Sequence, residues 1–338
     1  MGNIYAAPAK RVQSIDGLRG FAILIVLLVH TLGIPAGGEL GVDIFFTMSG
    51  YLISSQLFAE SAKTGTINLR LFYWKRCKRL VPAFLAVCLL YVAMSYCFPA
   101  SVPSPNLLKM LSLLLMSNIY WAQGVPPIPF LQHTWSLAVE WQFYLAWPVV
   151  LIVFSKLGVG RKGTFAFLVL TVVSVWVARS QGDQFLRFDG VLMGSMIPLV
   201  QDSKSIRRVC ESKYAAWLIF MPCLIAIIVL VYQPVLSYLG PTKPVISVLT
   251  AGIIAFLAIG QGSRATALFD NRFLRHFGEI SYGLYLYHFP IAALMYVNGM
   301  LPTKMLVVGL LVSIPIAEVS WLYLESPLLQ SGRSKGRP

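Results

Sequence analysis

Eleven long runs of apolar residues dominate the sequence and restrict the folds open to it. A helix that crosses a membrane needs about 20 mostly apolar residues. Only 12% of the residues are charged, about half the share found in soluble domains. The sequence therefore predicts an all-α, polytopic integral membrane protein. The runs cover residues 17–34, 40–59, 80–98, 107–122, 135–155, 164–179, 188–201, 214–233, 245–261, 280–298 and 304–324.

The formal net charge is +14, and its distribution along the sequence is typical of a membrane protein rather than of a nucleic-acid-binding protein. Lys and Arg gather in short segments between apolar runs, as the positive-inside rule expects of cytoplasmic loops. Both termini are therefore expected in the cytoplasm. The basic segments include Lys10 and Arg11, the loop expected at 60–79, and residues 156–162, 204–213, 264–275 and 333–337. The segments poor in Lys and Arg, which are expected outside, are 98–106, 123–133, 233–241 and 298–302.

One apolar run conflicts with this alternation, because 107–122 would both start and end outside. A re-entrant or interfacial segment there resolves the conflict and leaves about ten spans. Re-entrant backbone is tolerated only where protein buries it or water reaches it. We therefore expect 107–133, with Pro126, Pro127 and Pro129, to form the wall of a cavity. Residues 1–338 are expected to form one membrane-embedded domain, with an uncleaved first span and no soluble domain after the last.

The first span carries two ionisable residues that suit a long anionic ligand. Arg19 and His30 are eleven residues apart, so they share a helix face about 16 Å apart. Arg19 then lies at the cytoplasmic edge, three residues after Asp16, and His30 lies deep in the membrane. This arrangement suits a substrate with an anionic head and a reactive far end. The alternative is an interfacial Arg and a core His that bonds a hydroxyl.

Arg76, Arg79 and Asp43 have two possible interpretations each. Two guanidinium groups three residues apart can face one phosphate, although they also fit ordinary positive-inside charge. Asp43 lies near the external end of the second run and is a possible orienting carboxylate for His30. It also fits an acid at a helix N-terminus, which the helix dipole favours.

Two later runs each place polar side chains on one helix face. Ser136, Glu140 and Tyr144 repeat at intervals of four residues, and His133 stands just outside them. In the run 280–298, three further polar residues share a face and predict a lined cavity. The alternatives are a structural tie for Glu140 and lipid-facing aromatic anchors for the tyrosines. Asp189 is another ionisable residue inside a run, and such residues are functional candidates. The three residues of the run 280–298 are Ser281, Tyr285 and His288.

Other chemistries have no support in the sequence. No metal-binding motif, no nucleophile elbow and no phosphate-cradling glycine loop is present. The five cysteines include no pair spaced for zinc, and their odd number does not indicate a disulfide framework. No internal repeat of the kind found in many transporters is visible.

These clusters, in this order, resemble the acyltransferase-3 family of bacterial membrane acyltransferases. The similarity covers essentially the whole chain. It rests on Ser14-Ile-Asp-Gly-Leu-Arg-Gly, the spacing of Arg19 and His30, Gly41-Val-Asp-Ile-Phe-Phe with Ser49-Gly50, Arg76 with Arg79, Ser136 with Glu140 and Phe143-Tyr144, and Ser281-Tyr with Tyr287-His288-Phe-Pro.

The resemblance implies transfer of an acyl group, commonly acetyl, from cytoplasmic acyl-coenzyme A to an acceptor hydroxyl in the bacterial cytoplasmic (inner) membrane. It implies a lipopolysaccharide, exopolysaccharide or other cell-surface glycan, or its lipid-linked precursor, as acceptor. On this basis we expect His30 to act as base or acyl relay, with Asp43 or Glu140 as its orienting partner. Arg19, Arg76 and Arg79 would hold the phosphates of coenzyme A.

Two other functions remain open from the sequence. One is acylation of a small molecule, since some family members acylate macrolides. Many members of the family also carry an additional extracytoplasmic SGNH-type domain. A transporter of a glycan or lipid-linked sugar would also place His and Glu inside spans, as proton relays. A non-catalytic scaffold would not need the polar helix faces described above.

Overall fold

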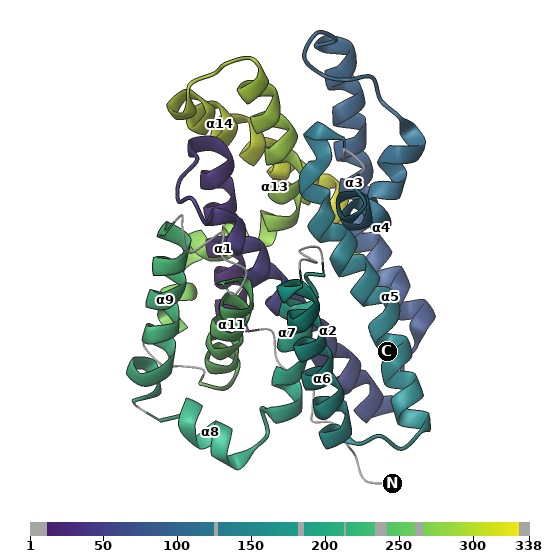
Figure 1. The fold of residues 1–338 in the computed structure, drawn as a ribbon, viewed down its shortest axis with the longest axis vertical. Helices are drawn as coiled ribbons and strands as arrows, with labels where there is room; N and C mark the ends of the chain where they lie inside the picture. Colours follow the sequence, from purple (N-terminus) through teal and green to yellow (C-terminus); the bar gives the residue numbers. More distant parts are fainter. Residues whose placement is uncertain are drawn as a thin grey trace. The chain divides into compact units, whose positions relative to one another are not determined.

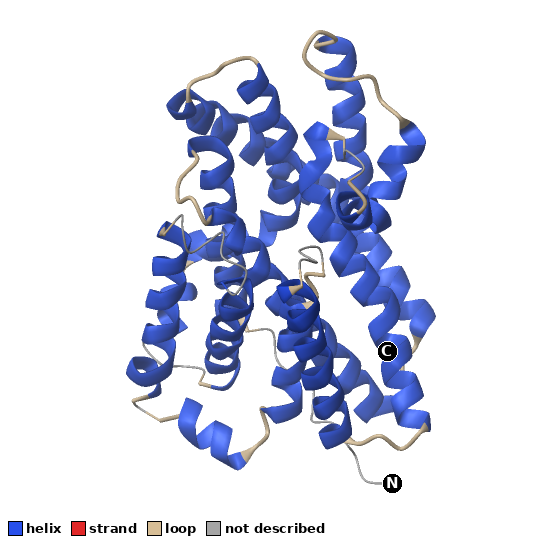
Figure 2. Cartoon of the chain, viewed as in Figure 1, coloured by secondary structure: helices blue, strands red, loops and turns tan. Residues whose placement is uncertain are grey.

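The computed structural model contains helices as its only regular elements in the part of the chain that it describes (Figure 2). The described residues are 12–124, 128–181, 186–212, 214–233, 242–260 and 266–330. The predicted all-α fold is confirmed within these ranges. Lys10, Arg11, Pro126, Pro127 and the basic tail 333–337, which carry parts of the predicted topology and cavity wall, lie outside them.

The helices follow the apolar runs closely. The α-helices are α1 (Gln13–Leu32), α2 (Gly41–Thr64), α3 (Leu69–Cys97), α4 (Leu107–Ala122), α5 (Trp135–Lys156), α6 (Arg161–Ser180), α7 (Asp189–Val200), α8 (Lys204–Cys210), α9 (Met221–Tyr232), α11 (Thr242–Ile259), α12 (Thr266–Phe269), α13 (Arg272–Val297), α14 (Pro302–Ser320) and α15 (Ser326–Gln330). The 3₁₀ turns are η1 (Gly38–Leu40) and η2 (Pro129–Thr134), and the π-helical turns are η3 (Ala216–Phe220) and η4 (Trp321–Glu325).

The basic residues expected in a loop at 60–79 lie largely on a helix instead. Helix α3 begins at Leu69, and the side chain of Asn68 caps it by accepting a hydrogen bond of 2.9 Å from the Leu71 amide. Such a cap satisfies one of the free amides at a helix start. Lys and Arg are also good helix formers. Arg76 and Arg79 are therefore held on the second and third turns of α3.

Six helical stretches are long and apolar enough to cross a membrane, judged by length and composition within the described residues. Helix α7 has 12 residues, which is about 18 Å and too short to span alone. The expected count of about ten spans is therefore not established. Helix α4 has 16 residues, and its re-entrant position stays a prediction. The six stretches are Gln13–Leu32, Leu69–Cys97, Pro129–Lys156, Arg161–Ser180, Arg272–Val297 and Pro302–Gln330.

The chain divides into two compact units, and α1, α5 and α13 each contribute residues to both. Unit 1 comprises residues Met1–Val26, Pro35–Ile67 and Gln142–Glu279. Unit 2 comprises residues Leu27–Ile34, Asn68–Trp141 and Ile280–Pro338.

Unit 1 is built around α7, which packs against α2, α6 and α11 (Figure 1). Helices α2 and α7 approach closely because glycines face the partner backbone. A Cβ atom built on Gly50 would lie 1.9 Å from the Val191 carbonyl oxygen, and one on Gly194 would lie 1.9 Å from the Thr47 carbonyl oxygen. Small residues of this kind let membrane helices pack backbone to backbone.

Unit 2 contains α3, α4, η2, α14, η4 and α15 together with parts of the three shared helices. Within it, α3 packs against η4 and α15. A small apolar cluster of Ala292, Met295 and Met305 joins α13 and α14. The end of α1 belongs to this unit, so His30 belongs to the same unit as most of α13.

Candidate active site

Three histidines from distant parts of the sequence lie together in unit 2. His30 stands near the end of α1, His133 in η2 and His288 in the middle of α13. The Nδ1 atom of His30 and the Nε2 atom of His288 are 3.0 Å apart, within hydrogen-bond distance. The ring of His133 lies 6.0 Å from that of His288, centroid to centroid. We call these three residues the histidine cluster.

His288 is fixed by its own helix. Its Nδ1 atom lies 2.9 Å from the carbonyl oxygen of Leu284, one turn earlier on α13. The side chain is 1% exposed, whereas His30 is half-buried. The more accessible imidazole of the bonded pair is therefore His30.

Tyr285 and Ser136 support the backbone at His133. The Tyr285 hydroxyl donates to the His133 carbonyl oxygen at 2.7 Å, and it lies 2.6 Å from the Ser136 hydroxyl. The Ser136 hydroxyl also lies 3.3 Å from the same carbonyl oxygen, so either hydroxyl can be the donor in the contact between Ser136 and Tyr285. The structure thus brings His30, His133 and these three residues of the two predicted polar faces, Ser136, Tyr285 and His288, into one unit.

The imidazole of His133 is a buried polar group beside this site. It is 4% exposed and stacks on Phe289 with ring centroids 4.8 Å apart. Neither ring nitrogen makes a hydrogen bond to a side chain in the described part of the chain. Buried polar atoms are normally satisfied, and the backbone of Leu286 lies within interaction range of this ring.

Tyr282 lies within electrostatic range of Glu325, Glu140 and Arg79, all in unit 2. Glu325 is 2% exposed and accepts a hydrogen bond of 2.9 Å from Ser320. The predicted site did not include this buried carboxylate, although a charge directly after the apolar run 304–324 is a signal for it. Arg79 and Glu140 thus both lie near Tyr282, and the predicted role of Arg79 toward phosphate stays a prediction.

Arg76, Arg19 and Ser281 each have a defined place on their helices. The Arg76 guanidinium lies 5.5 Å from the ring centroid of Phe72, one turn earlier on α3. Arg19 is half-buried on the part of α1 that belongs to unit 1, so its convergence with Arg76 and Arg79 stays a prediction. Ser281 is 1% exposed on α13.

Asp43 and Asp189 are buried in unit 1, where each forms an ion pair with an arginine. Asp43 pairs with Arg187, and Asp189 pairs with Arg179 at 2.8 Å. Both carboxylate side chains are 0% exposed. Sequence reasoning missed the two arginines, because no local pattern joins α2 to the segment before α7, or α6 to the first residue of α7. The proposed orientation of His30 by Asp43 stays a prediction.

Tyr144 also belongs to unit 1, where its hydroxyl donates to Ser49 at 3.3 Å. The helical periodicity that grouped it with Ser136 and Glu140 is real, because all three lie on α5. Its hydrogen-bond partner nevertheless comes from α2.

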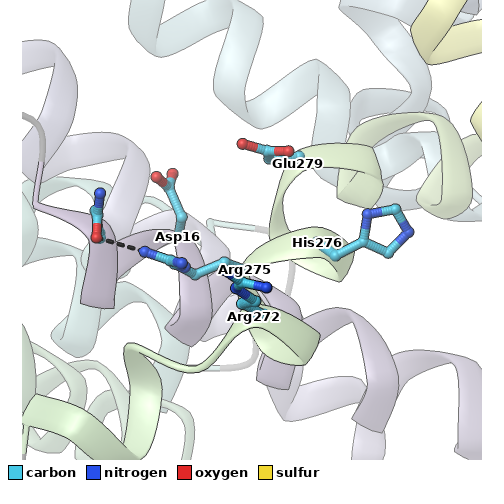
Figure 3. A pocket seen from close by; sticks show the side chains of 6 residues that line it. Asp16, Arg272, Arg275, His276 and Glu279 are labelled. Carbon is cyan, nitrogen blue, oxygen red and sulfur yellow. Dashed lines mark hydrogen bonds between the residues drawn. The ribbon is translucent and has the colours of Figure 1, made fainter.

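A pocket of about 320 Å³ lies at the first turns of α1 and α13 in unit 1 (Figure 3). Arg275 reaches Gln13 there and also forms an ion pair of 3.0 Å with Asp270. The two arginines and two carboxylates of the lining balance in charge, so the pocket has no net charge to select an anion. Its lining residues are Gln13, Asp16, Arg272, Arg275, His276 and Glu279.

Fold and site together define a multi-pass helical membrane protein with a histidine cluster formed by distant helices. The chain belongs to the acyltransferase-3 family, whose acyltransferase domain matches residues 12–324. This confirms the resemblance inferred from the ordered motifs.

The chain is similar to curated relatives over nearly its whole length. It is 30% identical to the peptidoglycan O-acetyltransferase OatA of Listeria monocytogenes, over 96% of this chain and 56% of the relative. It is 28% identical to the O-acetyltransferase OatA of Staphylococcus aureus, over 96% of this chain and 58% of the relative. The chain thus spans a little over half the length of these relatives. No solved structure matches it.

Proposed function

We propose that this chain is a membrane O-acyltransferase that transfers an acetyl group from acetyl-coenzyme A to a hydroxyl of a cell-wall glycan. The observation that carries the proposal is the bonded pair of His30 and His288, 3.0 Å apart, in a chain of the acyltransferase-3 family. The names of the relatives favour peptidoglycan, or a precursor of it, over the lipopolysaccharide acceptor expected from sequence.

His30 is the proposed base. Its imidazole takes the proton of the acceptor hydroxyl, and the hydroxyl oxygen attacks the thioester carbonyl carbon. The carbon–sulfur bond then breaks, and the thiolate of coenzyme A takes the proton back from His30. The products are the O-acyl glycan and free coenzyme A, with no net gain or loss of protons. A relay through acyl-His30 would divide the same transfer into two steps.

The donor and acceptor would be held by different groups. Arg19, Arg76 and Arg79 are the proposed partners of the phosphates of coenzyme A, since guanidinium groups bind phosphate in a bidentate manner. The buried ring of His133 is the proposed partner of an acceptor hydroxyl. The proposed cytoplasmic position of both chain ends rests on the loop charges, and that of the donor rests on the resemblance to the family.

The test is acyl transfer by His30→Ala in membranes that contain the protein. With labelled acetyl-coenzyme A and peptidoglycan fragments, transfer should fall by about two orders of magnitude or more, because the base is lost. His276→Ala is the matched control, since it removes an exposed histidine at the start of α13. Both variants should accumulate to the wild-type level. Near-normal transfer by His30→Ala would reject His30 as the base.

A further inference from the structure

His30 and His288 belong to a series of hydrogen bonds that starts at the backbone carbonyl of Leu284. A backbone carbonyl oxygen only accepts hydrogen bonds, so the contact of 2.9 Å between the Leu284 oxygen and His288 Nδ1 places a proton on Nδ1. His288 is 1% exposed on a membrane helix, where burial of an unpaired charge is costly. A neutral His288 with its proton on Nδ1 has a lone pair on Nε2.

The lone pair of His288 then decides where His30 carries its proton. The Nε2 atom of His288 can only accept, and His30 Nδ1 lies 3.0 Å from it. His30 must therefore carry its proton on Nδ1 and donate it to His288. The Nε2 atom of His30 is left with a lone pair, which is the state that a base or a nucleophile requires.

We propose that His288 is a positioning residue that fixes the reactive tautomer of His30 through the Leu284 carbonyl. The proposal rests on the proposed function of His30 but concerns a different residue. A neutral imidazole and a backbone carbonyl thus perform the task that a carboxylate performs in other histidine sites. Asp43 and Glu140 are not needed for this task.

The first test reads the tautomers directly. The chain contains four histidines, so ¹⁵N-histidine labelling gives a simple NMR spectrum of the protein in lipid bilayers. His30→Gln and His288→Gln identify the signals by their absence. We expect a protonated Nδ1 and an unprotonated Nε2 for both rings, which is the minor tautomer of free histidine. A protonated Nε2 on neutral His30, or a doubly protonated His288, would overturn the proposal whatever the activity.

The second test separates positioning from packing through two substitutions of His288. The amide oxygen of His288→Gln can take the place of Nε2 and accept the proton of His30 Nδ1. His288→Leu is of similar size but accepts nothing. We expect His288→Gln to keep most of the turnover rate, kcat. His288→Leu should lower kcat by about two orders of magnitude or more, as loss of the correct tautomer does elsewhere, with little change in KM for acyl-coenzyme A.

A packing control lies on the same helix. Met295→Leu alters a buried residue of α13 that is 6% exposed without touching the hydrogen-bonded chain, so it should keep its kcat. Equal kcat in His288→Gln and His288→Leu would overturn the positioning role. If His30→Ala also kept its activity, the proposed function of His30 would fail as well. Loss of activity in His30→Ala alone would leave that function standing and reject only the role of His288.

Discussion

Single charged residues inside unit 1 have partners that make them costly to change. Arg179 and Asp189 are 4% and 0% exposed in their side chains, and 2.8 Å separates them. Trp176 also donates to Asp189, at 3.3 Å. Removal of one partner of a buried ion pair leaves the other charge without compensation, at a cost of about 3–5 kcal/mol.

Arg179→Gln should therefore lower the free energy of unfolding in detergent by about 3–5 kcal/mol. Glu211→Gln is the control, because its ion pair with Arg207 is exposed. The Glu211 side chain is 48% exposed and the Arg207 side chain is 54% exposed. Exposed pairs contribute about 0–1 kcal/mol. The double variant Arg179→Gln/Asp189→Asn should recover part of the loss. A loss no larger than that of Glu211→Gln would show that Asp189 does not depend on Arg179.

At the scale of elements, the packing of α2 on α7 depends on the absence of side chains. Gly194→Ala places a methyl group 1.9 Å from a backbone oxygen of α2, so the two helices must separate. We expect a loss of about 1–3 kcal/mol or more, as for other overpacked positions, measured by unfolding in detergent. Gly160→Ala is the control, because a Cβ atom there meets nothing within 4 Å. Equal stability of the two variants would contradict the close contact.

The elements also show what the sequence could predict. Apolar runs fixed the position of most helices, because a buried or lipid-facing helix needs a continuous run. The apolar run 80–98 covers only the later part of α3, because the first turns of the helix carry the charges of residues 70–79. The only sequence signal for the start of this helix is the capping residue Asn68. The run 188–201 was counted among the expected spans, but α7 within it has 12 residues and is too short to cross a membrane alone. Local hydropathy does not determine how deeply a helix extends into the membrane.

The candidate site could be predicted from the sequence only where its residues lie on one helix. Spacing along one helix groups Ser136 with Glu140, and Tyr285 with His288, because the helical repeat is local. The contact between His30 and His288 joins residues 258 positions apart. The ion pairs of Asp43 and Asp189 likewise depend on which helices meet. No local pattern carries that information.

At the scale of the whole molecule, the loop charges predict which segments face the cytoplasm. Reporter fusions after Gly124 should report an external position, and fusions after Gly158 a cytoplasmic one, because α5 lies between them. Alkaline phosphatase, which folds only outside, measures this in intact cells. Activity at Gly158, or none at Gly124, would reverse the assigned orientation of α5.

The separation of His30 from His288 has a consequence for biosynthesis. Ribosomes add about 5–20 residues per second, so the 258 positions between the two histidines take about 13–52 seconds to translate. During that interval α1 is already made while its imidazole has no partner on α13. The nascent chain therefore contains the proposed base without the group that sets its proton, and the reactive form arises only when α13 joins unit 2.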